Sequence, residues 1–83
     1  MKITLKLFAT LGDLLPAGSR ENAAVVEVPE DATPNQVIDM FKVPRPMAHL
    51  VLINGGYVEP DRREQPVLKE NDVLAIWPPV AGG

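Results

Sequence analysis

The stretch DATPNQVIDMFKV, residues 31–43, predicts the single helix of the chain and thereby decides the fold. Thr33 suits the N-cap and Pro34 the first helical position, while Gln36 completes a capping box with the cap residue. The apolar stripe of this helix consists of Val37, Ile38, Met40 and Phe41. Pro44 has no backbone N–H to donate and disfavours the helical conformation of Val43. We therefore expect the helix to end near Lys42.

Strands are predicted before and after this helix in the sequence. Four runs have the alternation or apolar content typical of strands: KITLKLF at 2–8, AAVVEVP at 23–29, HLVLI at 49–53 and VLAIW at 73–77. In the first run, Ile3, Leu5 and Leu7 fall on one face. The NGG segment at 54–56 predicts a tight turn with positive φ, and a brief strand begins at Tyr57.

One helix and four or five strands bury their apolar faces best when the helix lies across one side of a mixed sheet. The first and last strands are predicted to be central and parallel, because nearly the whole chain is available for the crossover between them. The sequence therefore predicts an α+β fold of the β-grasp type. Residues 1–77 form the domain, and residues 78–83 form a flexible, extended C-terminal tail.

Composition narrows the class of protein. The 83 residues carry a net charge of −3 and no cysteine, which argues against nucleic-acid binding, disulfides and thiolate chemistry. The apolar run at the N-terminus is interrupted by Lys6 and closed by Asp13, so it does not resemble a signal peptide. Since no apolar stretch is long enough to cross a bilayer, we expect a cytoplasmic protein without a membrane partner.

The segment WPPVAGG, residues 77–83, predicts a chain end with a function. Pro78 and Pro79 end the hydrogen-bonded ladder and favour an extended tail that reaches roughly 20 Å. The earlier pair Gly55–Gly56 is explained by a turn, whereas Gly82–Gly83 closes none. Without side chains at its tip, the terminal carboxylate is able to approach a nucleotide or a partner's backbone.

An ionised terminal carboxylate is a poor electrophile and needs activation. ATP provides it by forming an acyl-adenylate, after which a sulfur nucleophile attacks the carbonyl carbon of Gly83. The chain has no P-loop motif, and His49 is its only histidine, so neither an ATP site nor a metal site is expected. Another protein must supply the active site.

Three segments, MKITLKLFATL, VLINGGYV and LKENDVLAIWPPVAGG, resemble the MoaD/ThiS family of sulfur-carrier proteins. The resemblance spans essentially the whole chain. It implies a ubiquitin-like β-grasp fold and no bound cofactor. It also implies that an E1-like enzyme adenylates Gly83 with ATP and that a sulfur donor system converts it to a thiocarboxylate, with Gly82 as its companion.

Within that family, PPVAGG is more similar to the small subunit of molybdopterin synthase, a non-catalytic co-substrate that delivers sulfur in the large subunit. The short segment between the helix and the HLVLING run is nearer to the thiazole type of carrier. The resemblance thus implies a carrier for the molybdenum or tungsten cofactor and leaves a thiazole or thiamine carrier open. A ubiquitin-like modifier that forms isopeptide bonds and a passive β-grasp binding module are further alternatives.

Strand alternation predicts an aromatic surface. Phe8 and Trp77 are expected on the sheet face opposite the helix, and Tyr57 is expected to join them. Matching positions of the molybdopterin synthase small subunit contact the large subunit, so the resemblance implies a docking surface here. The predicted partner-binding residues are these three aromatics and the tail residues Pro78, Pro79, Val80 and Ala81.

The charged segment DRRE, residues 61–64, is predicted to be a solvated loop. Arg62 and Arg63 are minor candidates for steering the domain toward a partner.

Overall fold

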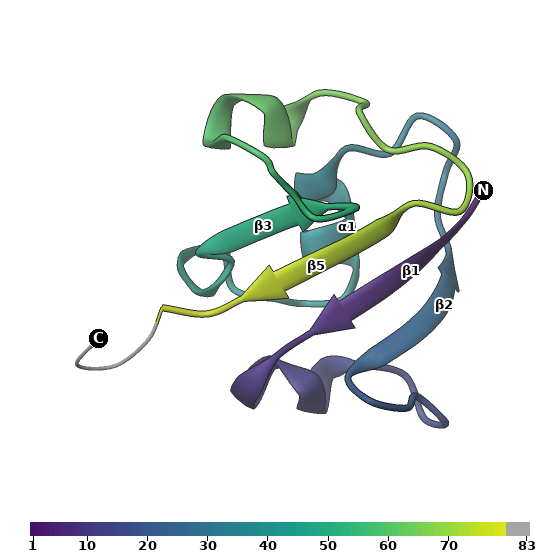
Figure 1. The fold of residues 1–83 in the computed structure, drawn as a ribbon, viewed down its shortest axis with the longest axis vertical. Coiled ribbons are helices and arrows are strands. Elements are labelled where there is room, and N and C mark those ends of the chain that lie inside the picture. The colour runs from purple at the N-terminus through teal and green to yellow at the C-terminus, as the bar shows by residue number, and fades with distance from the viewer. Residues whose placement is uncertain (80–83) are drawn as a thin grey trace.

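The computed structural model describes residues 1–79, in which a mixed sheet carries an α-helix on one face (Figure 1). Its strands are β1 (Lys2–Leu7), β2 (Ala23–Glu27), β3 (Leu50–Ile53), β4 (Gly56–Tyr57) and β5 (Val73–Trp77). The helix is α1 (Pro34–Met40), and three 3-10 helices are η1 (Ala9–Leu14), η2 (Arg45–Met47) and η3 (Pro60–Glu64). None of the helices in the described part of the chain is long and apolar enough to cross a membrane.

The strand order is β2-β1-β5-β3-β4, with β1 and β5 parallel at the centre of the sheet. Strands β2 and β3 flank this pair and run antiparallel to their neighbours. This arrangement confirms the predicted β-grasp fold. Strand β2 ends before the predicted boundary because Pro29 has no donor for the ladder, and β3 begins one residue later than predicted.

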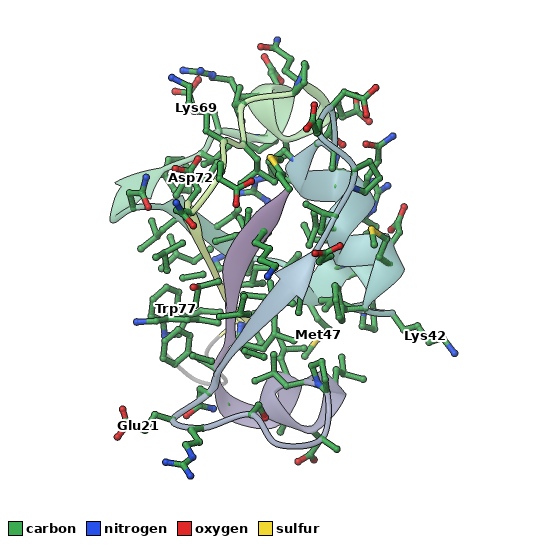
Figure 2. All side chains as sticks on the ribbon, turned by 90° about the vertical axis from the view of Figure 1, so that its right-hand side faces the viewer. Glu21, Lys42, Met47, Lys69, Asp72 and Trp77 are labelled. Carbon is green, nitrogen blue, oxygen red and sulfur yellow. The ribbon has the colours of Figure 1, made fainter. Side chains whose placement is uncertain are left out.

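The core lies between the sheet and α1. Alternate residues of the two central strands point to this side and are almost fully buried, among them Ile3, Leu5, Leu7, Leu74 and Ile76. Val37 and Ile38 of α1 pack against them in the same buried cluster. Figure 2 shows no helix over the opposite face of the sheet within residues 1–79, and Leu50 and Tyr57 on that face are exposed.

Both ends of α1 are capped by its own sequence. The Thr33 hydroxyl accepts from the Gln36 amide at 3.1 Å, and the Gln36 side chain accepts from the Thr33 amide at 2.8 Å, which confirms the capping box. At the other end, the Val43 amide donates to the Ile38 carbonyl at 3.0 Å. This bond and the left-handed conformation of Lys42, with φ 61°, form a Schellman motif.

Lys42→Gly is expected to stabilise the protein by about 0.5–1 kcal/mol. A Cβ atom is unfavourable in the left-handed conformation, and this gain exceeds the extra entropy of glycine in the unfolded chain. Urea unfolding followed by circular dichroism measures the difference. Lys42→Ala is the matched control, since it removes the same side chain but keeps Cβ; an equal gain in Lys42→Ala would contradict the explanation.

A two-residue turn joins β3 and β4. Asn54 and Gly55 have φ of 51° and 85°, as a type I′ hairpin requires. The prediction of positive φ was wrong for Gly56, which is paired with Ile53 as a strand residue. The Asn54 side chain also accepts from the Val73 amide at 2.9 Å, so the turn is fixed to the start of β5.

A surface ion pair connects α1 to η2. Arg45 donates from Nε and Nη2 to the two carboxylate oxygens of Asp39, each at 2.8 Å. This hydrogen bonding lowers the pKa of Asp39 below its ordinary value, an effect that desolvation partly opposes and the charge of Arg45 reinforces. The depressed pKa means that the pair stabilises the fold above the unfolded-state pKa, and that this contribution is lost as the pH falls through the folded-state pKa.

We therefore expect Asp39→Asn to lose less stability than the wild type on acidification from about pH 5 to about pH 2. Both side chains are about half exposed, so the difference is small. Urea midpoints at several pH values measure it. A wild type and Asp39→Asn with parallel pH profiles would show that the pair does not contribute.

Candidate functional site

The chain leaves the sheet at the end of β5, where it is held from both sides. The Ile76 carbonyl accepts from the Phe8 amide at 3.2 Å, and the Trp77 carbonyl accepts from the His49 amide at 3.1 Å. Pro78 follows and is buried, whereas Pro79 is exposed. We call Trp77 and Pro78 the tail root, because the direction of the departing chain is fixed there (Figure 1).

Gly82 and Gly83, predicted to carry the chemistry, and Val80 and Ala81, predicted to bind a partner, lie outside the described residues, and their roles stay predictions. The predicted boundary between domain and tail after Trp77 also stays a prediction. Because Pro78 is buried, its ring offers little surface to a partner in the free protein. Pro79 is exposed, so a partner is able to contact the chain from this residue onward.

Two aromatic rings lie beside the tail root. Phe8 and Trp77 stack with 4.0 Å between ring centroids and an angle of 3° between ring planes. Figure 2 shows Trp77 on the side of the sheet away from α1, as strand alternation predicted. Leu50 pairs with Trp77 in the ladder and is 37% exposed, so it extends this apolar surface onto β3.

Tyr57 lies on the same face, one strand further from β5. It pairs with Leu52 and is 56% exposed. Its ring does not take part in the Phe8–Trp77 stack; it lies 5.8 Å from the guanidinium carbon of Arg63. We define the open-face patch as Phe8, Leu50, Tyr57 and Trp77.

Leu50 was missing from the predicted docking residues. The run HLVLI is apolar throughout, as suits a central strand, and such a run does not single out one residue as exposed. Its pairing with Trp77 identifies the exposed face. The alternation between Leu50, exposed, and Val51, fully buried, becomes visible only once the strand partners are known.

The prediction of a solvated DRRE segment was wrong for Arg63, which is only 8% exposed. Its guanidinium donates to the carbonyl oxygens of Val58 at 3.0 Å, Ala48 at 3.0 Å and His49 at 3.3 Å. Two of these acceptors, Ala48 and His49, are 15 and 14 residues away in the sequence, and local charge patterning does not reveal such contacts. Arg62 stays exposed, as predicted. It lines a shallow hollow beside Tyr57 together with Ile53, Gly56, Val58 and Val67.

Within residues 1–79, no three His, Cys, Asp or Glu side chains are placed to hold a metal ion together. The His49 contact described above is made by its backbone amide. In the described residues, the arrangement is an apolar patch that lies next to the tail root, where the chain leaves the sheet.

The fold and the site define a small ubiquitin-like β-grasp protein of the carrier or modifier class. The chain belongs to the ThiS family, whose model it matches over residues 5–83. No curated protein matches the chain. The family match includes the second half of β1, the open-face patch and residues 78–83.

Solved structures agree with this assignment. SAMP1, a small archaeal modifier protein of Haloferax volcanii, is 29% identical with a TM-score of 0.66, and the match covers 100% of both chains. A protein assigned as molybdopterin converting factor subunit 1 in Pyrococcus furiosus is 27% identical with a TM-score of 0.63, over 95% of this chain and 98% of that one.

The same fold occurs in a complex of subunits 1 and 2 of the molybdopterin-converting factor from Helicobacter pylori. Identity to that chain is 15%, the TM-score is 0.57, and both chains are covered completely. This likeness concerns the fold alone. Together, the comparisons support a sulfur carrier or ubiquitin-like modifier in the MoaD/ThiS group.

Proposed function

We propose that the protein is a sulfur carrier that works as a co-substrate of other enzymes. The carboxylate of Gly83 attacks ATP in the active site of an E1-like partner, giving an acyl-adenylate and pyrophosphate. A hydrosulfide ion supplied by a donor system then attacks the carbonyl carbon of Gly83, so that a C–S bond forms, the C–O bond to the phosphate breaks and AMP leaves. The product is a thiocarboxylate at Gly83. Gly82 has no side chain that would obstruct access to this group.

The observation that carries this proposal is the ThiS family match, which extends to Gly83. The geometry of the tail root supports it. Because Trp77 is the last residue bonded into the sheet and Pro79 is exposed, the residues from Pro79 to Gly83 span about 16 Å at about 3.3 Å each when extended. A tail of this length is suited to enter a narrow active site of a partner while the domain stays outside.

The proposed acceptor is an enzyme of molybdopterin synthesis, for the molybdenum or tungsten cofactor. The similarity to the Pyrococcus furiosus protein favours it, as does the double proline of the tail. In this proposal the open-face patch binds the acceptor subunit and the tail reaches that subunit's active site. A thiazole carrier would use the same activation with another acceptor.

The test is intact-mass analysis of the protein after incubation with ATP, a sulfide source and an E1-like enzyme. The proposal expects a mass gain that equals one exchange of oxygen for sulfur, located at the C-terminal peptide. The proposal would be contradicted if the mass stayed unchanged with every E1-like enzyme whose gene lies next to the gene for this protein.

A ubiquitin-like modifier is the second candidate, and the similarity to SAMP1 favours it. It shares the adenylation step, but a lysine amine of a target protein attacks in place of sulfur, giving an isopeptide bond. The two functions differ in product. Conjugates of higher mass that disappear when a target lysine is replaced would identify the modifier.

A further inference from the structure

Arg63 occupies an unusual position for a charged residue in η3. It is buried, and its guanidinium donates to carbonyl oxygens that precede β3 and follow β4. A buried charge is stable only where hydrogen bonds replace its lost hydration. Among the described residues, the one carboxylate ion pair is Asp39–Arg45, so Arg63 is compensated by carbonyl groups. The segments that supply these groups are therefore held at fixed distances from one another.

One of these carbonyl groups connects Arg63 to the tail root. His49 accepts from Nη2 of Arg63 through its carbonyl at 3.3 Å and donates through its amide to the Trp77 carbonyl at 3.1 Å. A path of two hydrogen bonds through a single residue thus runs from the buried guanidinium to the last strand residue before the tail.

A second connection runs from Arg63 to the open-face patch. The Tyr57 ring lies 5.8 Å from the guanidinium carbon, within the range of a cation–π interaction, and its hydroxyl lies 3.5 Å from Nη2. Leu50, also in the patch, directly follows His49. Arg63 therefore contacts Tyr57 directly. It also contacts His49, which precedes Leu50 in the sequence and is hydrogen-bonded to Trp77.

We propose that Arg63 is a positioning residue that fixes Leu50 and Tyr57 of the open-face patch relative to the tail root. A partner that binds the patch then receives the tail at a constant angle. This inference rests on the proposed sulfur-carrier function, and it takes the activating enzyme to bind the open-face patch, as the acceptor subunit is proposed to do. It adds a buried residue that belongs to neither the open-face patch nor the tail root.

Arg63→Lys is the informative variant. Lysine keeps the charge but carries a single ammonium group, which does not replace a planar fork aimed at three carbonyl groups. Arg45→Lys is the matched control, because Arg45 is an exposed arginine on the helix side of the domain. Arg63→Met, which removes the charge and the donors but keeps an unbranched apolar side chain, is a second variant in case lysine is poorly tolerated.

The first measurement is amide hydrogen exchange of the folded variants, read by NMR. We expect the His49 amide to exchange about tenfold faster in Arg63→Lys, while the Ala75 amide in the middle of β5 is unchanged. A general loss of stability would accelerate both amides equally. Equal acceleration, or an unchanged His49 amide, overturns the proposal.

The second measurement is the rate of thiocarboxylate formation as a function of carrier concentration. Because docking changes and the chemistry at Gly83 does not, Arg63→Lys is expected to raise KM about tenfold and to change kcat less than about twofold. Arg45→Lys should match the wild type in both values. A KM that changes no more than in the control overturns the proposal.

The two proposals fail in different ways. If the wild type forms no thiocarboxylate with any activating enzyme, the sulfur-carrier function fails, and the hydrogen exchange of the His49 amide alone decides the role of Arg63. If the wild type is sulfurated normally and Arg63→Lys behaves as the control does, the function stands and the positioning role is wrong.

Discussion

A chain lengthened by one alanine behind Gly83 is expected to lose thiocarboxylate formation almost completely. The extension moves the reactive carboxylate outward by about 3.5 Å and adds a methyl group where the tail enters its partner. A displacement of about 1 Å at a reacting centre already costs on the order of a hundredfold in rate. We therefore expect a decrease of at least that size in the rate of sulfur incorporation, measured by intact mass.

The matched control carries one alanine in front of Met1. The N-terminus lies at the end of β1 away from the tail root, so this addition leaves the exit of the chain unchanged (Figure 1). Both extended proteins should unfold at the same urea concentration as the wild type. Normal sulfur incorporation by the protein with an alanine added after Gly83 would show that the carboxylate of Gly83 is not the reacting group.

Trp77→Ala is expected to weaken binding of the acceptor subunit by about 30-fold, which corresponds to about 2 kcal/mol. Trp77 presents a large apolar ring, held flat by Phe8, at the point where the tail begins. Buried aromatic anchors of this kind dominate the binding energy of protein interfaces. Phe8→Ala should reduce the affinity as well, because the tryptophan ring loses its support.

Calorimetric titration with the acceptor subunit measures these affinities, and Val25→Ala is the control. Val25 lies on the edge strand β2, is 70% exposed, and is separated from Trp77 by β1. Removing it should leave binding unchanged within about twofold, as is usual outside the centre of an interface. If Val25→Ala and Trp77→Ala had the same affinity, the open-face patch would not be the docking surface.

The variants also separate binding from folding. Trp77→Ala loses the aromatic stack, which contributes about 0.5–1.5 kcal/mol beyond its buried area, so some loss of stability accompanies the change. Unfolding curves recorded under the titration conditions establish that the variant is folded. A loss of affinity in a fully folded Trp77→Ala is then a property of the surface.

The sequence predicted the fold well because its signals are local. The capping box of Thr33 and Gln36 fixes the start of α1, and the period-two pattern of residues 2–8 and 73–77 fixes which side chains enter the core. The same alternation correctly placed Phe8 and Trp77 on the opposite face. Patterns within one segment are sufficient for such predictions.

The rest of the site depends on contacts between distant segments. Arg63 is buried because carbonyl groups at residues 48, 49 and 58 converge on it, and a sequence that reads DRRE contains no sign of this. The left-handed conformation of Lys42 was also unexpected, since glycine is the usual residue at that position. The burial of Arg63 is settled by tertiary contacts, and the conformation of Lys42 by the backbone hydrogen bonds that end α1.

The central place of β5 couples the usefulness of the terminus to the integrity of the whole domain. Strand β5 inserts between β1 and β3, so the sheet is incomplete until the C-terminal part of the sequence has joined the N-terminal part. A misfolded or truncated molecule, in which β5 is not inserted, therefore lacks the tail root that directs the C-terminus. An activating enzyme that recognises the patch and the tail together would thus spend ATP only on intact molecules.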